Sequence, residues 1–237
     1  MKVPCKDVDE RTTRYKSIFD SYVGITLNWQ QFEYAKLRFK YVGLEESEGF
    51  KVFCADAANP QSWSNDITDA ISSLQPQSKS RLNADTNELL KNEIWVLALD
   101  CLYHFKPSRG PIFEYSAKTL NANIMAFDLL LADNISPLNL FLLKAVGRLM
   151  DCPPHAFKKR FDYLDQLRIA GYGHVETYDI SEHVFAPLAK FLRRQERDLK
   201  TIGLGLGKLK VATWLFEWWA SNAVVRGVIV VAKHHDP

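Results

Sequence analysis

The sequence predicts an α/β fold in which a mostly parallel sheet is covered by helices on both faces. Short apolar runs alternate with longer segments of helical spacing along the first half of the chain. Strands joined by helices pair in parallel, and a parallel sheet is normally covered on both faces. Hydrophobic residues make up 47% of the 237 residues, enough to bury a core. We expect one domain over residues 1–237, because single cores grow to roughly 250 residues before chains split.

The first half of the chain supplies four expected strands and the helices between them. Each apolar run is too short for a helix and ends at a turn or a polar change. The strands are expected at 22–27, 51–55, 94–99 and 124–132, and the main helices at 29–40 and 110–120. Residues 60–93 are rich in Ser, Asn, Gln and Asp, which predicts a polar surface insertion with short helices at 64–74 and 84–91.

The second half is expected to be mainly helical until two late strands. We expect helix from 137 to about 170, a strand at 172–180, helices at 182–200 and 208–222, and a last strand at 227–233. Gly171 should end a helix in a left-handed conformation. The stretch GLGLGK at 203–208 follows a charged helix, so it predicts a loop and no phosphate-binding turn.

Composition excludes several classes of protein. The net charge of +2 hides no long basic tract, which argues against nucleic-acid binding. The four cysteines lie far apart and the histidines show no ligand spacing, so we expect neither a disulfide framework nor a metal site. The start of the chain shows no apolar run typical of a signal peptide, and charges interrupt the apolar stretches 127–150 and 211–232. We therefore expect a cytoplasmic protein without a transmembrane segment.

Four segments resemble, in order and spacing, the class I (Rossmann-like) S-adenosylmethionine-dependent methyltransferases. They are VGITLNWQQFEYAKLRF at 23–39, CADA at 54–57, WVLALDCLYHFKPSR at 95–109 and FDYLDQLRIAGYGHVETYDI at 161–180. The resemblance implies a mostly parallel methyltransferase sheet whose last strand, GVIVVAK, is inserted antiparallel. It also implies S-adenosylmethionine as the cofactor.

The first two segments carry the residues that the resemblance places beside the cofactor's adenosine. Those beside the ribose and adenine would be Thr26, Leu27, Asn28 and Gln31. Asp56 would accept a hydrogen bond from the adenine amino group, and the next backbone N–H, that of Ala57, would meet a ring nitrogen. Taken alone, Asp56 fits a turn or helix-cap aspartate equally well.

The third segment carries the residues that the resemblance places near the reacting methyl group. Asp100 and Leu102 would lie beside the methionine half of the cofactor, with Tyr103 and His104 between it and the acceptor. His104 is the candidate base for a hydroxyl or acidic-carbon acceptor, because imidazole takes up protons near neutral pH. A loop histidine bonded to the backbone is the alternative interpretation.

Three tryptophans follow late in the chain, and they have two interpretations. They would line an apolar acceptor pocket or an interfacial surface, or they would simply pack in the core. The three are Trp214, Trp218 and Trp219.

The chain departs from the family pattern at its start. Residues 1–21 contain no glycine, whereas the family has a first strand and a glycine-rich turn before the segment at 23–39. We therefore expect an atypical segment at 1–13 and a first strand that is missing or replaced.

The leading hypothesis is a methyltransferase that acts on a small-molecule or lipophilic acceptor. The alternative is a catalytically inactive or truncated methyltransferase-like protein that acts as a binding module. A nicotinamide-dependent oxidoreductase is disfavoured, because it needs the same glycine turn and a ribose-binding carboxylate. The expected partner is a small or lipid-like molecule; peripheral contact with a membrane stays open, and the sequence predicts no oligomeric state.

Overall fold

The computed structural model describes residues 20–44, 49–74, 81–82, 89–90, 93–149, 153, 156–207 and 209–234. The chain divides into two compact units, residues 1–94 and 95–237, and each is described by itself. The expectation of one domain over the whole chain stays a prediction.

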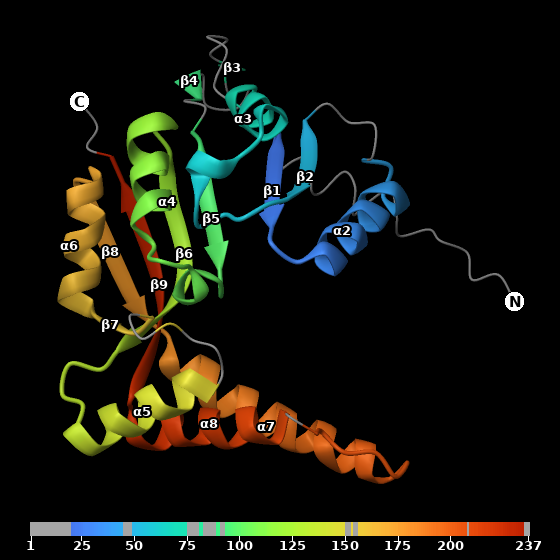
Figure 1. Cartoon of the computed structure of the whole chain (residues 1–237), viewed down its shortest axis with the longest axis vertical. Coiled ribbons are helices and arrows are strands. Elements are labelled where there is room, and N and C mark those ends of the chain that lie inside the picture. Colours follow the sequence, from blue (N-terminus) through green and yellow to red (C-terminus); the bar gives the residue numbers. More distant parts are fainter. Residues whose placement is uncertain are drawn as a thin grey trace, which may run out of the picture. The chain divides into compact units, whose positions relative to one another are not determined.

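The first unit is built on two parallel strands. Strand β1 (Tyr22–Thr26) pairs with β2 (Phe50–Cys54), and helix α2 (Trp29–Tyr41) connects them (Figure 1). The turn η1 (Pro60–Ser62) and helix α3 (Asn65–Ser72) follow β2. Helix α3 buries three apolar side chains, whereas α2 buries none. The expected strands at 22–27 and 51–55 and the helices at 29–40 and 64–74 are confirmed.

The helix expected over 84–91 is wrong where the structure describes it. Strand β4 (Leu89–Leu90) pairs antiparallel with β3 (Arg81–Leu82), and residues 83–88 lie outside the described residues. A segment of eight residues is too short to hold a helix without packing, since isolated helices below about 12 residues are marginal in water.

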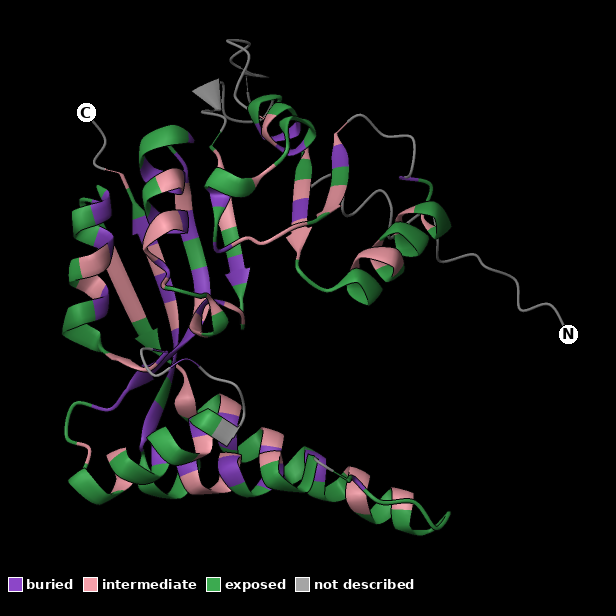
Figure 2. Cartoon of the chain, in the orientation of Figure 1, coloured by how far each residue is buried: buried purple, intermediate pink, exposed green. Residues whose placement is uncertain are grey.

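The second unit contains a five-stranded sheet. Its main strands run in the order β5 (Trp95–Leu99), β6 (Asn123–Leu131), β9 (Val225–Lys233) and β8 (His174–Asp179), and the two-residue strand β7 (Lys158–Lys159) pairs with the end of β6. Strands β5 and β6 are parallel, and β9 is antiparallel to both of its neighbours. The expected antiparallel insertion of the last strand is confirmed. Buried positions concentrate on β6 and β9 (Figure 2), the two central strands.

Helices cover this sheet at two places. Helix α4 (Gly110–Glu114) continues through a single wide turn, η3 (Tyr115–Thr119), and contacts α6 (Arg160–Ala170). Helices α5 (Pro137–Leu149), α7 (Ser181–Lys200) and α8 (Leu209–Asn222) form a layer at the carboxyl ends of β5, β6 and β8 (Figure 1). One apolar core joins this layer to the sheet: Leu129, Leu131, Leu143, Phe185, Leu215, Trp219, Val224 and Val225.

The helix expected from 137 to about 170 is interrupted. Helix α5 ends at Leu149, and α6 begins only at Arg160, after strand β7. The sequence has two adjacent prolines at 153 and 154, which remove backbone donors and clash with a continuing helix. Gly171 caps α6 with φ of 122°, which confirms the predicted left-handed end of that helix.

The expectations about the start of the chain fall outside the described residues. Residues 1–13 are not described, and the strand that would replace the family's first strand therefore stays a prediction. Among the described residues, β1 pairs only with β2 and β5 only with β6. Each helix among the described residues is too short or too polar to span a bilayer.

Candidate functional site

The carboxyl ends of β1 and β2 lie together in the first unit. Thr26 stands opposite Cys54 in the parallel register, and the Ala55 N–H donates to the Thr26 carbonyl at 3.0 Å. In open parallel sheets, ligands bind beyond the carboxyl ends of the strands. The residues predicted to contact adenosine therefore share one edge of this small sheet.

Three of these residues form the turn that starts α2. Asn28 is the N-cap, and its side chain accepts a hydrogen bond from the Gln31 N–H at 3.0 Å. Thr26 Oγ1 donates to Gln31 Oε1 at 2.8 Å and accepts from the Asn28 N–H at 3.3 Å. The network fixes the turn and leaves the Leu27 side chain exposed. An N-cap and its partners explain Thr26, Asn28 and Gln31 locally, whatever else they contact.

Asp56 has a structural role that uses one of its two oxygens. Oδ1 accepts from the Ala58 N–H at 2.9 Å, which is an Asx turn, and the Asp56 carbonyl accepts from the Trp63 indole at 2.8 Å. No donor to Oδ2 is found among the described residues. One carboxylate oxygen is thus held by the turn and the other stays available. The neighbouring Ala57 is half-buried.

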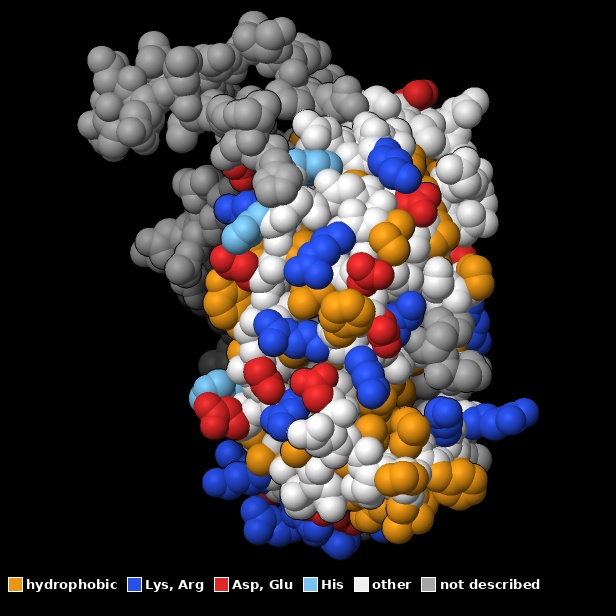
Figure 3. Space-filling view, turned by 90° about the vertical axis from the view of Figure 1, so that its left-hand side faces the viewer, with side chains coloured by type: hydrophobic (Ala, Val, Ile, Leu, Met, Phe, Trp, Pro, Cys, Tyr) orange, Lys and Arg blue, Asp and Glu red, His pale blue; other side chains and the backbone are white. Residues whose placement is uncertain are grey.

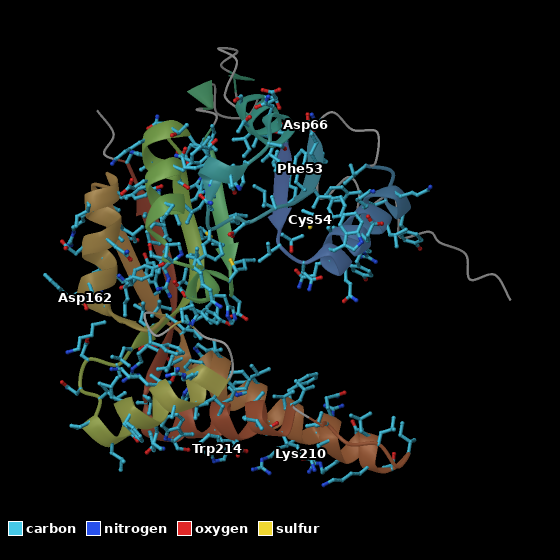
Figure 4. All side chains as sticks on the ribbon, viewed as in Figure 1. Phe53, Cys54, Asp66, Asp162, Lys210 and Trp214 are labelled. Carbon is cyan, nitrogen blue, oxygen red and sulfur yellow. The ribbon has the colours of Figure 1, made fainter. Side chains whose placement is uncertain are left out.

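Cys54 belongs to this edge, and sequence reasoning missed it. Its thiol is exposed and lies 3.7 Å from the carbonyl oxygen of Leu27. Figure 4 shows its sulfur at the end of β2. The signal that points to Cys54 is its position two residues before Asp56, in the segment CADA.

In the second unit, Asp100 directly follows β5 and has an unusual backbone conformation. Its φ is 58°, which is rare outside glycine and recurs at functional sites. The Asp100 N–H donates to the Phe127 carbonyl at 3.2 Å, and the Tyr103 hydroxyl donates to Asp100 Oδ1 at 2.9 Å. The ring of Tyr103 lies 4.3 Å from that of His104, which is exposed. Three of the four predicted residues of this segment therefore lie together.

Leu102, the fourth, points elsewhere. Its side chain is buried under the single turn η2 (Leu102–His104), where it packs in the interior. A contact between Leu102 and the cofactor stays a prediction, and the backbone is the part of the residue that remains near Tyr103.

A cavity of about 140 Å³ opens beside these polar groups. Asp100, Tyr103 and His104 line one part of it, and apolar side chains from β6, α5, α7 and α8 line the rest, together with Phe157 just before β7. A pocket that is mostly apolar with a few converging polar groups is typical of small-molecule sites.

Four aromatic side chains form part of the cavity wall. The ring of Trp219 lies 5.9 Å from that of Phe157, 5.4 Å from Phe185 and 5.7 Å from Phe216. Trp219 is only 5% exposed, and its indole nitrogen is buried without a hydrogen-bond partner in the described part of the chain. A buried N–H normally finds an acceptor, so Trp219 combines a ring that lines the cavity with a donor that has no partner among the described residues.

Sequence reasoning identified one of these four residues. Trp219 was predicted to line a pocket or to pack in the core, and it does both. Phe157, Phe185 and Phe216 were missed because they come from three separate segments, which only tertiary packing brings together. Trp214, in contrast, lies on the surface.

The segment that carries Tyr103 and His104 is anchored by a buried ion pair. Arg109 Nε lies 2.8 Å from Asp128 Oδ2, and Arg109 also donates to the Ala156 carbonyl at 2.7 Å. The guanidinium carbon lies 5.4 Å from the centre of the Tyr163 ring. Burial, with smaller contributions from Asp128 and Asp100, raises the pKa of the nearby Cys101 thiol to about 11.

A second, polar cavity of about 420 Å³ lies at the ends of β6, β8 and β9. Two arginines line it, and each has a partner: Arg160 Nε donates to Thr177 at 2.8 Å, and Arg226 lies 3.4 Å from Asp179. Two aspartates, Asp133 and Asp179, also line the cavity and balance the charge of the two arginines. The lining therefore favours neither an anion nor a cation. Among the described residues, no group of His, Cys, Asp and Glu is placed to hold a metal ion.

Comparisons with known proteins address the fold. No protein-family model matches the sequence, and no curated protein matches it either. Solved structures do match. Phosphoethanolamine N-methyltransferase 2 of Haemonchus contortus, in complex with phosphomonomethylethanolamine and S-adenosylhomocysteine, is 12% identical with a TM-score of 0.63. The match covers 97% of this chain and 47% of that protein, so the chain spans about half its length.

Two further structures show the range of reactions on this fold. Geranyl diphosphate C-methyltransferase of Streptomyces coelicolor, with Mg²⁺, geranyl diphosphate and S-adenosylhomocysteine, is 11% identical over 96% of this chain and 69% of that one, with a TM-score of 0.59. The [4+2]-cyclase SpnF is 13% identical over 96% and 72%, with a TM-score of 0.54. Likenesses at this identity establish architecture only. The chain has the fold of the class I S-adenosylmethionine-dependent methyltransferases.

Proposed function

We propose that this protein transfers a methyl group from S-adenosylmethionine to a small, lipophilic acceptor that carries an oxygen. The observation that carries the proposal is the apolar cavity beside Asp100, Tyr103 and His104, whose wall includes Trp219, a residue with an indole N–H that has no partner among the described residues. The fold supports the choice of cofactor, since similar structures hold S-adenosylmethionine or its product.

The residues at the edge of the first unit fit an adenosine. Asp56 keeps one carboxylate oxygen without a donor among the described residues, as an adenine amino group requires. Leu27 offers an exposed apolar side chain for a base to pack against. The chemistry that the cofactor supplies when bound is an electrophilic methyl group on a sulfonium. These contacts would hold its adenosine half.

The chain's own residues then have three tasks. The aromatic wall excludes water and orients the acceptor, and orientation contributes about 7–11 kcal/mol in favourable cases. Trp219 donates a hydrogen bond to an oxygen of the acceptor, which fixes its direction in the cavity. His104 accepts the proton that a hydroxyl acceptor releases, and its exposure lets that proton pass to solvent.

Calorimetric titration of the whole chain with S-adenosylmethionine and S-adenosylhomocysteine tests the cofactor. We expect micromolar binding of both, weakened about tenfold or more in Asp56→Asn, because hydrogen bonds to charged groups contribute about 1.5–3 kcal/mol. Asparagine keeps an oxygen for the Asx turn, so this variant separates the adenine contact from the fold of the turn. Asp66→Asn is the matched control, because Asp66 lies exposed in the first turn of α3.

The acceptor is tested with radiolabelled cofactor and a pair of probes. An isoprenoid alcohol should be methylated and a small polar amine should not. A folded chain that binds neither form of the cofactor would overturn the proposal. Cofactor binding without methyl transfer to any lipophilic acceptor would favour a non-methylating reaction of the cyclase kind.

A further inference from the structure

Helices α7 and α8 form a hairpin whose far end leaves the core. The ion pairs between them join Arg193 to Glu217 and Lys210 to Glu196, so the helices run in opposite directions. The buried residues of α7 are Phe185, Ala189 and Leu192, all in its first twelve positions. Beyond them the hairpin extends away from the sheet (Figure 1). Among the described residues of the turn between the two helices, 201–207, only Leu206 is buried, at 8% exposed.

The turn between the two helices exposes large apolar side chains. Ile202 is 68% exposed and Leu204 is 57% exposed. Leu209 and Val211, at the start of α8, are exposed as well. Two bulky aliphatic side chains exposed to water at the outermost turn do not stabilise the fold. Exposed apolar surface of this kind commonly marks an interaction site.

The same end of the hairpin is strongly basic. Residues 190–211 hold seven Lys and Arg against Glu196 and Asp198, a net charge of +5, whereas the whole chain carries +2. Glu196 is shared by Lys200 and Lys210, each at 3.4 Å. Arg193 is paired with Glu217 of α8, so the basic side chains of this stretch without an ion pair among the described residues are Lys190, Arg194 and Arg197.

One side of α8 continues this surface toward the sheet. Lys210 and Trp214, one helical turn apart, lie on the same outer side of the hairpin (Figure 4). Trp214 is 51% exposed and stacks on Trp218 at 5.7 Å. Seen from the side opposite the hairpin's far end, hydrophobic side chains gather at the lower right of the molecule and Lys and Arg at the lower left (Figure 3). Tryptophan beside lysine and arginine is the composition of a membrane interface.

We propose that this hairpin docks on an anionic lipid bilayer, with Ile202 and Leu204 entering the interface and the surrounding Lys and Arg contacting lipid headgroups. The charge decides between partners. A second copy of the chain would bring two net-positive surfaces together, which like-charge repulsion opposes. Anionic lipids complement that charge, and the apolar turn finds hydrocarbon that a nucleic acid does not offer. This inference stands without the proposed function.

Co-sedimentation of the whole chain with vesicles tests the proposal. We expect binding to vesicles of phosphatidylcholine with phosphatidylserine, weak binding to phosphatidylcholine alone, and loss of binding as salt is raised. Arg194→Gln and Arg197→Gln should each weaken binding about fivefold, the usual contribution of one basic residue near an anionic surface. Arg168→Gln, an exposed arginine of α6, is the matched control and should change nothing.

The apolar turn is tested by Ile202→Ser combined with Leu204→Ser. This variant should lose at least about tenfold in vesicle affinity while its circular dichroism and melting temperature stay the same. Ile169→Ser on α6 is the control, because Ile169 is 69% exposed, as Ile202 is. Absence of binding to anionic vesicles would overturn the proposal. So would a concentration-dependent dimer in sedimentation velocity that Ile202→Ser abolishes, since a second copy would then be the occupant.

Discussion

Arg109 and Asp128 form a two-point ion pair inside the larger unit: Nε lies 2.8 Å from Oδ2, and Nη2 donates to Oδ1 at 3.1 Å. Both side chains are buried. Burial acts to raise the pKa of Asp128, and the Arg109 guanidinium and the Leu129 N–H act against it. The pair ties the segment of Tyr103 and His104 to β6.

Breaking this pair should strongly destabilise the protein. Asp128→Asn leaves a buried guanidinium without its counter-charge, which typically costs about 3–5 kcal/mol. The double variant Arg109→Met with Asp128→Leu should recover most of that loss, because a well-packed apolar pair avoids the desolvation of two charges. Urea unfolding followed by circular dichroism measures both. Equal stability of Asp128→Asn and the wild type would contradict this account.

His104 is expected to act in turnover and not in cofactor binding. His104→Ala should lower kcat with a hydroxyl acceptor by about 10²–10⁴, the usual contribution of a general base, while the affinity for S-adenosylhomocysteine stays the same. His183→Ala is the matched control, because His183 is an exposed histidine of α7. Unchanged turnover in His104→Ala would remove this residue from the mechanism.

Trp219 is expected to select acceptors that carry an oxygen. Trp219→Phe keeps an aromatic ring in the cavity and removes the N–H, so KM for an oxygen-bearing acceptor should rise about 5–100-fold, as a lost buried hydrogen bond costs about 1–3 kcal/mol. Trp214→Phe on the surface should leave KM unchanged. Steady-state kinetics with matched hydroxylated and deoxygenated acceptors make the test. An equal effect of Trp219→Phe on both acceptors would indicate packing alone.

Two cysteines should differ sharply in reactivity toward iodoacetamide. The Cys54 thiol is exposed, whereas burial raises the pKa of the Cys101 thiol to about 11. At pH 8 only about one Cys101 side chain in a thousand is a thiolate, the reactive form. Peptide mapping by mass spectrometry should find Cys54 modified and Cys101 intact, with S-adenosylhomocysteine protecting Cys54.

The raised pKa of Cys101 also makes the stability of the protein depend on pH. The folded pKa of Cys101 is raised above its ordinary value of 9.0. The protonated thiol therefore contributes stability that is complete below pH 9 and is lost as pH rises toward 11. Cys101→Ala should flatten this alkaline part of the stability curve. Rapid alkylation of Cys101 in the native protein at pH 8 would contradict both expectations.

Local patterns predicted most of the fold because each strand carries its own signal. The runs at 124–132 and 227–233 are apolar enough to be central strands, and they are. The two failures came from weaker signals. Leu89 and Leu90 lie in a short polar segment without a helical stripe, and the prolines at 153 and 154 were outweighed by the helical spacing around them.

The candidate site was predictable where a motif is continuous in sequence. Asp100, Tyr103 and His104 stand within five residues, so one turn places them together. The aromatic wall could not be predicted, since Phe157, Phe185 and Trp219 meet only through packing. The turn role of Asp56 was foreseen as an alternative, and the structure gives it to one oxygen of the carboxylate.

At Asp100 the requirements of stability and of the site differ. The positive φ favours glycine, whereas the hydrogen bond with Tyr103 requires the carboxylate. Glycine takes this conformation without steric strain, so a library selected only for heat resistance would tend to enrich it there. That exchange would also delete the carboxylate that holds the Tyr103 hydroxyl at the cavity. Substitutions that raise thermal stability should therefore be sought on helix surfaces far from β5, with Asp100 left unchanged.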